Sequence, residues 1–220
     1  MKAFLKKYRH ALLILTYLPF YLLWFFLLEQ HVTEDYSVIE SPLDSYIPFN
    51  EYFIIPYLLW FPFIAFSTLY FIFLDRIECY RLCGLLIAGM TVFLLVSTFY
   101  PNGVNLRPDL SELGRDNFCI DLVASLHKAD TSTNVCPSIH VYNSLAVCLA
   151  FLVSPHSKGK RLFKTGVVIL TALICMSTVF LKQHSVIDVF WAFVLIAVAA
   201  PFFYARRAPK KERNICPTAE

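Results

Sequence analysis

Charged residues are scarce in this chain. Only 16% of its 220 residues are Asp, Glu, Lys or Arg, whereas 58% are hydrophobic, and the mean hydropathy is +0.59. A soluble domain has about 25% charged residues and about half apolar ones. Here the apolar residues also form long uninterrupted blocks. This composition excludes an ordinary soluble domain and predicts an all-α protein that crosses a lipid bilayer several times.

The sequence also lacks an internal repeat, a low-complexity tract and a cysteine framework. Of its seven cysteines, only Cys119 and Cys136 are expected on the oxidising side of a membrane, where they are either bridged or two free thiols. Cys79 and Cys83 lie four residues apart without a second such pair, which argues against zinc. We expect no metal, no cofactor and no nucleic-acid partner.

Six segments are apolar enough to be membrane spans, for which about 20 residues are needed. They are residues 11–28, 53–74, 82–100, 137–153, 162–181 and 185–204. The fourth is the shortest and begins with a polar turn. We predict a single integral membrane domain over residues 1–220 with six transmembrane helices. The first helix follows a basic segment and is expected to be a retained signal anchor.

The distribution of Lys and Arg predicts the orientation. With six spans both termini lie on one side, which then holds 15 of the 19 basic residues. The other side keeps Arg107, Arg115, Lys128 and Lys182. Cytoplasmic loops carry the excess of basic residues. Both termini are therefore predicted to be cytoplasmic, with two long loops, roughly 31–52 and 101–136, outside. The acidic residues of the first loop are expected to be solvated.

Three ionisable residues lie near the outer ends of predicted helices. His184 and Asp188 are four residues apart and share one helix face. The carboxylate then accepts a hydrogen bond from one imidazole nitrogen and leaves the other as a nucleophile or base. Pro137 suits the first position of a helix. It places Ser138 and His140 in a first turn, where free backbone N–H groups bind anions.

Two of the few outer cations, Arg107 and Lys182, are candidates to bind an oxyanion. Each polar residue taken alone has a structural interpretation: His140 as an interface histidine, His184 with Asp188 as a structural pair, and Arg107 as a solvated charge. Their joint position at one edge favours a phosphate-handling active site at the extracytoplasmic face of the membrane.

These motifs resemble the type-2 phosphatidic acid phosphatase superfamily, the lipid phosphate phosphatases and phosphotransferases. Its signature is Lys-x6-Arg-Pro, then Pro-Ser-Gly-His, then Ser-Arg-x5-His-x3-Asp. The matching residues are Arg107 and Pro108, then Pro137, Ser138 and His140, then Ser177, His184 and Asp188. The resemblance covers roughly residues 100–190, and six spans are the family's plan.

Three positions depart from the signature: Tyr100 replaces its Lys, Thr178 its Arg and Ile139 its Gly. Two phosphate-binding cations are thus missing, and we expect Lys182 to replace one of them. The motif with Ile139 is similar to the Pro-Ser-aliphatic-His of inositol phosphorylceramide synthases, a phosphotransferase branch.

The resemblance implies a metal-independent lipid phosphate phosphatase that works through a phosphohistidine. His184, oriented by Asp188, is the nucleophile, and His140 is the general acid and later the base. The phosphate-binding residues are Arg107, Ser138, Lys182 and Ser177.

Two alternatives stay open at this point. A phosphotransferase would move a phospho-head group to an acceptor alcohol, and a non-enzymatic transporter or lipid-binding protein would use the same polar residues without turnover. The expected partners are a membrane lipid phosphate and the bilayer. The sequence identifies neither the lipid nor the oligomeric state.

Overall fold

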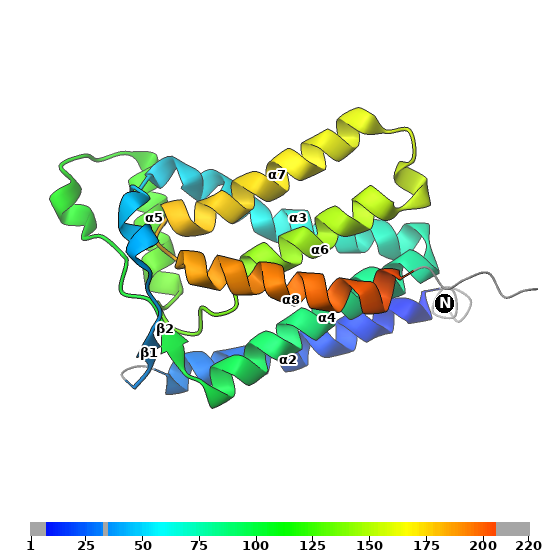
Figure 1. The fold of residues 1–220 in the computed structure, drawn as a ribbon, viewed down its shortest axis with the longest axis horizontal. Helices are drawn as coiled ribbons and strands as arrows, with labels where there is room; N and C mark the ends of the chain where they lie inside the picture. Colours follow the sequence, from blue (N-terminus) through cyan, green and yellow to red (C-terminus); the bar gives the residue numbers. More distant parts are fainter. Residues whose placement is uncertain (1–7, 33–34, 206–220) are drawn as a thin grey trace, which may run out of the picture.

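The computed structural model describes residues 8–32 and 35–205 (Figure 1). Its α-helices are α2 (Leu12–His31), α3 (Ile54–Leu74), α4 (Arg76–Phe99), α5 (Phe118–Ala129), α6 (Ile139–Val153), α7 (Arg161–Phe180) and α8 (Val186–Tyr204). All but α5 run along the long axis of the molecule. Most basic residues of the two chain termini, on which the predicted orientation partly depends, lie outside the described residues.

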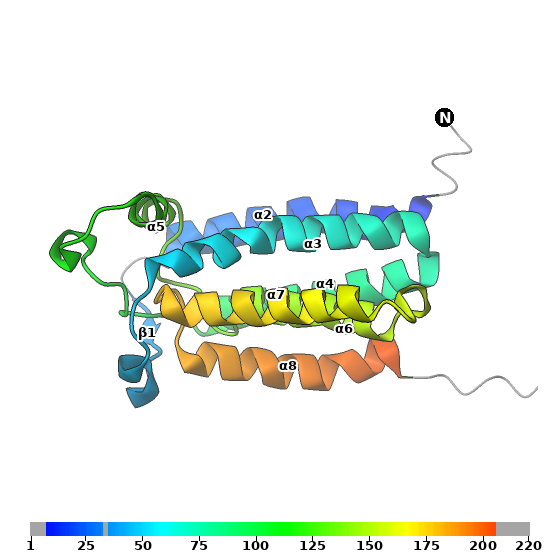
Figure 2. The same ribbon diagram turned by 90° about the horizontal axis from the view of Figure 1, so that it is seen from above.

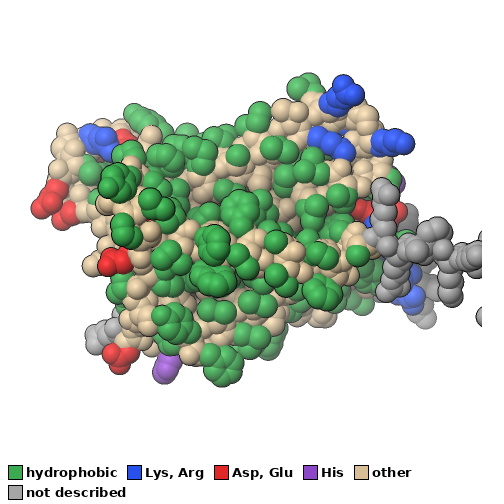
Figure 3. Space-filling model, in the orientation of Figure 1, with side chains coloured by type: hydrophobic (Ala, Val, Ile, Leu, Met, Phe, Trp, Pro, Cys, Tyr) green, Lys and Arg blue, Asp and Glu red, His purple; other side chains and the backbone are tan. Residues whose placement is uncertain are grey.

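Five helical segments of the described chain are long and apolar enough to cross a membrane. They are Arg9–His31, Glu51–Leu74, Arg76–Phe99, Arg161–Phe180 and Val186–Tyr204. Hydrophobic side chains cover the long face of the bundle (Figure 3). The mostly helical chain is therefore consistent with an all-α integral membrane protein, and five of the six predicted spans coincide with helices long and apolar enough to cross a membrane. The remaining one, α6, has 15 residues, or about 22 Å of helix, against a hydrocarbon core of about 30 Å.

Helix α6 is short because other helices, rather than lipid, surround it. It packs against α3, α4, α7 and α8, and nine of its 15 residues are buried. Figure 2 shows the bundle as layers, with α2 and α3 on one side, α4, α6 and α7 in the middle, and α8 on the other side. A helix in this position needs neither the length nor the apolar surface of a lipid-facing span.

Three connecting segments gather at one end of the bundle, here called the site end. The two-residue strand β1 (Ser37–Val38) pairs in parallel with β2 (Asn102–Gly103), and Gly103 forms a further bridge to Thr133. The 3-10 helices η2 (Pro42–Tyr46), η3 (Glu51–Phe53) and η4 (Leu110–Leu113) lie in the same segments. At the opposite end, η1 (Arg9–Ala11) precedes α2 and η5 (Pro155–Ser157) follows α6.

Helix α5 was missing from the sequence prediction, which treated residues 101–136 as one long loop. Its start is capped by Asn117, whose side-chain oxygen accepts hydrogen bonds from the N–H groups of Cys119 and Ile120. Cys119, Ile120 and Val123 are buried on its inner face. This spacing of apolar residues behind an Asn cap is the signal that could have revealed the helix. Cys119 and Cys136 are both free thiols.

The packing of α4 on α6 depends on a glycine. The ring of Tyr142 is 1% exposed, and its hydroxyl donates a 2.8 Å hydrogen bond to the carbonyl of Leu85. A Cβ atom added at Gly89 would lie 1.9 Å from Cε1 of that ring, whereas one added at Gly166 in α7 meets nothing within 4 Å.

We predict that Gly89→Ala destabilises the protein by about 1–3 kcal/mol, because the held Tyr142 ring has to move. Gly166→Ala, the matched control, should be neutral or stabilising by up to about 1 kcal/mol through helix propensity. Thermal unfolding of both variants in detergent tests this. Equal midpoints for the two would contradict the packing argument.

Candidate active site

His140 and His184 face the same small cavity at the site end. Their ring centroids are 5.8 Å apart, and the ring planes are inclined by 61°. The cavity measures about 40 Å³ and is also lined by Phe25, Phe93, Asp130, Thr131, Thr133, Asn134, Val135, Ile139 and Gln183. At about 10–15 Å³ for each water, this volume holds roughly three waters. A small oxyanion fits this volume, but a hydrocarbon chain does not.

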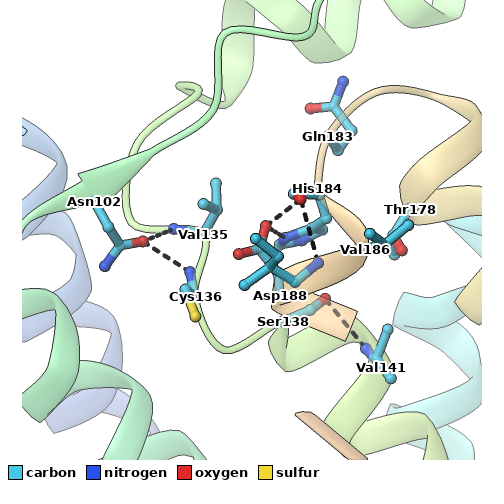
Figure 4. A network of polar contacts seen from close by, with 12 residues as sticks. Asn102, Val135, Cys136, Ser138, Val141, Thr178, Gln183, His184, Val186 and Asp188 are labelled. Carbon is cyan, nitrogen blue, oxygen red and sulfur yellow. Dashed lines mark hydrogen bonds and ion pairs between the residues drawn. The ribbon is translucent and has the colours of Figure 1, made fainter. Parts of the chain in front are cut away.

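Asp188 lies behind His184, one turn into α8. One carboxylate oxygen, Oδ2, is 3.4 Å from Nδ1 of His184 and accepts the N–H of Ser185 at 2.9 Å (Figure 4). The 3.4 Å contact is longer than an ordinary hydrogen bond, and such catalytic pairs often tighten only when the substrate is bound. Nδ1 of His184 has no hydrogen-bond partner, and the fully buried Asp188 carboxylate is the acidic group that faces it.

The two histidines are tied together through the backbone. The N–H of Ser138 donates a 3.2 Å hydrogen bond to the main-chain carbonyl of Asp188, which joins the start of α6 to the start of α8. The Ser138 hydroxyl caps α6 by accepting the N–H of Val141 at 3.5 Å. His140 follows in the first turn of α6, as the sequence predicted, with Ser138 as the cap rather than a helical residue.

Aromatic side chains of α3 hold the ring of His140. Tyr57 stacks on it at a centroid distance of 4.6 Å, and Trp60 lies at 4.3 Å with its plane tilted by 45°. Nδ1 of His140 is buried without a hydrogen-bond partner. The two aromatic side chains therefore fix the position of the His140 ring beside His184.

Arg107 is the sequence-predicted cation that the fold brings to the histidines. Its guanidinium donates to the carbonyls of Asp130 and Thr131, at 2.8 and 2.6 Å, and to Oε1 of Gln183 at 2.6 Å. Burial lowers the pKa of Arg107, and the nearby Asp130 carboxylate opposes this shift. Gln183 precedes His184 and lines the cavity. Because Arg107 is bonded to Gln183, its fixed positive charge lies beside the cavity.

None of the four predicted phosphate ligands, Arg107 included, is among the residues that line the cavity. Nζ of Lys182 donates to the carbonyls of Asp44 and Ile47, at 2.6 and 2.5 Å. The buried Ser177 hydroxyl donates to the carbonyl of Ile174 at 2.7 Å, within its own helix. Thr178, at the position of the missing Arg, shapes the turn instead, because its carbonyl accepts the N–H groups of both Gln183 and His184.

The expectation that the acidic residues of the first loop are solvated is wrong for two of them. Asp44 and Glu51 are only 3% and 2% exposed. Glu51 forms a 2.9 Å ion pair with Arg115, and Asp44 accepts hydrogen bonds from the start of α8. Sequence reasoning missed both, since their partners are distant in the chain.

Polar residues in the cavity wall were missed as well. Asp130 is among the residues that line the cavity of the histidines. Burial raises the pKa of its carboxyl group, and the charge of Arg107 opposes this shift. Asn134, only 5% exposed, has a side-chain oxygen without a hydrogen-bond partner.

The Cys136 thiol lies near Asp188. Burial and, to a lesser extent, the charge of Asp188 raise the pKa of this thiol to about 12. Among the described residues, no three His, Cys, Asp or Glu side chains are grouped to hold a metal ion.

Asn102 holds the segment that leads to Ser138 and His140. Its side-chain oxygen accepts the N–H groups of Val135 and Cys136, at 3.0 and 2.8 Å (Figure 4). Its main-chain carbonyl accepts the N–H of Asn134 at 2.6 Å. Since Asn102 is fully buried, no water replaces these bonds if its side chain is removed.

Comparison with known proteins leaves the site to be interpreted by itself. No protein-family model, curated protein or solved structure matches the chain. Function is therefore argued from the geometry and chemistry of the described residues.

We predict that Asn102→Ala lowers the stability of the protein by about 1–3 kcal/mol for each buried N–H group left without a partner. Asn105→Ala, in the same loop but exposed, is the matched control and should unfold like the wild type. Thermal unfolding in detergent measures both. An Asn102→Ala midpoint equal to that of Asn105→Ala would show that the segment is held by other contacts.

Proposed function

We propose that this chain is a membrane enzyme that cleaves a phosphate ester of a lipid through a phosphohistidine on His184. The observation that carries the proposal is the common cavity of His140 and His184, with the buried Asp188 carboxylate behind only one of them. Two histidines with different partners suit two different roles, a nucleophile and a proton donor.

The reaction has two steps. Nε2 of His184 attacks the phosphorus in line, the P–N bond forms, and the ester P–O bond breaks while His140, as imidazolium, gives its proton to the leaving oxygen. Water then attacks the phosphohistidine, and His140 takes the proton of that water as the P–N bond breaks. Inorganic phosphate and the lipid alcohol are the products, and both histidines are restored.

Fixed donors would stabilise the charge of the transition state. Arg107 is held by carbonyl groups beside the cavity, and the start of α6 presents backbone N–H groups next to His140. Donors that are oriented before the reaction can each lower a barrier by a few kcal/mol. In this proposal the binding of phosphate by Lys182, Ser138 and Ser177 would require these side chains to leave their present partners.

The proposed topology has α6 as the sixth crossing, both termini in the cytoplasm and the site at the extracytoplasmic edge. The end opposite the site carries the described cations Arg76, Arg81, Lys158, Lys160, Arg161 and Lys164. In Figure 3 Lys and Arg side chains gather near that end, and most acidic side chains in view lie at the other. This asymmetry supports the orientation. A lipid in the outer leaflet would then place its phosphate near the cavity.

One observation favours a second candidate, a phosphotransferase. Asp130 is among the residues that line the cavity, and its carboxylate would repel a phosphate dianion there but accept a hydrogen bond from a hydroxyl group. A phosphodiester lipid with a hydroxyl-bearing head group, or an acceptor alcohol, would satisfy it. The second step would then use that alcohol in place of water.

We predict that wild-type protein releases phosphate from at least one member of a panel of lipid phosphates with EDTA present. His184→Ala and His140→Ala should each lower the rate by about 10²–10⁴-fold, the range of general acid–base and related effects. Asp188→Asn should reduce it less. His31→Ala, an exposed histidine at the same end of the bundle, is the control and should keep full activity. Normal turnover by a folded His184→Ala or His140→Ala protein would refute these roles, and no release from any substrate would favour the phosphotransferase or a lipid-binding protein.

We also predict that Asp130→Asn changes the choice of substrate. Removing the carboxylate charge should raise phosphate release from monoester lipids several-fold if repulsion of the dianion limits binding. It should lower transfer from a phosphodiester lipid to a lipid alcohol. Parallel assays of release and transfer with the two proteins measure the ratio. An unchanged ratio would show that Asp130 does not contact the head group.

A further inference from the structure

We propose that Asp44, in the segment before α3, is a positioning residue that orients the Asp188–His184 pair through Ser185. The kinetic part of this inference rests on the proposed function of His184. The structural part concerns the imidazole itself and does not depend on any substrate.

The Asp44 carboxylate is part of the N-terminus of α8, although it lies 141 residues before Ser185 in the sequence. One oxygen, Oδ2, accepts the Ser185 hydroxyl at 2.6 Å, and Oδ1 accepts the N–H of Val186 at 2.8 Å. Oδ2 also accepts the N–H of Ser41 at 2.8 Å. Asp44 is buried, so these three donors take the place of water around its carboxylate.

Ser185 carries this restraint to the catalytic pair. Its hydroxyl donates to Asp44 and accepts the N–H of Ile187 at 3.2 Å. Its own N–H donates to Oδ2 of Asp188, the same oxygen that faces Nδ1 of His184. Because Ser185 is fully buried and bonded on both sides, a change at Asp44 moves the donor that aims the Asp188 carboxylate.

A second set of bonds holds the same loop against the turn that carries His184. Nζ of Lys182 donates to the carbonyls of Asp44 and Ile47. Lys182 itself has a left-handed backbone with φ of 59°. The N–H of Asn50 donates to the carbonyl of Phe180 at 3.0 Å. The turn between α7 and α8 is thus bonded to the segment before α3 on both sides of His184.

The arrangement exceeds what capping of α8 requires. Ser185 and Asp188 already form a capping box at this helix start, which satisfies free N–H groups locally. Asp44 adds a second carboxylate from a distant segment and fixes the side chain of Ser185 rather than leaving it to rotate. The bond from the Val186 N–H is itself an ordinary cap, since a helix start leaves its first N–H groups free. The bond from the Ser185 hydroxyl is not needed for capping, and a positioning role explains it.

The test uses the full-length protein in detergent with Asp44→Ala, Asp44→Asn and Ser185→Ala. Asp35→Asn, an exposed acid of the same loop, is the control. The first readout is the ¹⁵N chemical shifts of the His184 ring, which report the nitrogen that carries the proton. Wild type and Asp35→Asn should hold the proton on Nδ1, and Asp44→Ala and Ser185→Ala should show a mixture of tautomers.

The second readout is phosphate release. Asp44→Ala and Ser185→Ala should lower kcat about 10-fold or more with KM changed less than 3-fold, because the nucleophile is misaligned and the cavity is intact. Asp44→Asn, which keeps one acceptor for Val186, should fall between Asp44→Ala and wild type. If Asp44→Ala does not fold, Ser185→Ala and Asp44→Asn still report both quantities.

The outcomes separate the two proposals. Tautomer mixing in the Asp44 and Ser185 variants of a protein without phosphatase activity supports the positioning role and counts against the proposed function. Folded variants with the wild-type tautomer and wild-type kcat overturn the positioning role. The same is true of variants whose only change is a lower unfolding temperature, since that is the signature of a purely structural cap.

Discussion

The burial of the Asp188 carboxylate at the first turn of α8 is the constraint on which the site end depends. A buried carboxylate needs fixed donors, and this one takes the N–H of Ser185 and faces the imidazole of His184. The same residue accepts the N–H of Ser138 with its main-chain carbonyl. The side chain and the main-chain carbonyl of Asp188 thereby fix the position of α8 relative to α6. This in turn fixes the distance between His184 and His140.

The cavity is organised by hydrogen bonds more than by excess positive charge. Arg107 is already bonded to two carbonyls and to Gln183, and Asp130 lies in the same wall. A site of this kind holds its donors in place before any ligand arrives, which is the property that electrostatic catalysis needs. It also distinguishes ligands by whether they bring a donor for the carboxylate, as well as by their negative charge.

The sequence was sufficient for features that depend on local patterns. Apolar runs marked the five long apolar helices. The four-residue spacing of His184 and Asp188 indicated that they lie close together, but the expected shared helix face is wrong, because His184 lies in the turn before Ser185, the N-cap of α8. It was insufficient where partners are distant in the chain. Nothing local shows that Lys182 points to the carbonyl of Asp44, or that Asp44 is buried. The central position of α6 also depends on four neighbouring helices and left its apolar run too short for a clear span.

The bonds between Asp44 and the start of α8 bear on how the protein is made. During translation α2 to α7 are synthesised before α8. The carboxylate of Asp44 therefore lacks its donor in Ser185, and the N–H of Ser138 lacks its acceptor in Asp188, until the last helix has been made. Closing so long a loop adds little entropy cost beyond that of a shorter one, but it comes late. The site end should therefore assemble as the final event of biosynthesis, after the earlier helices have inserted, and a chain that stops before α8 would present an unfinished site.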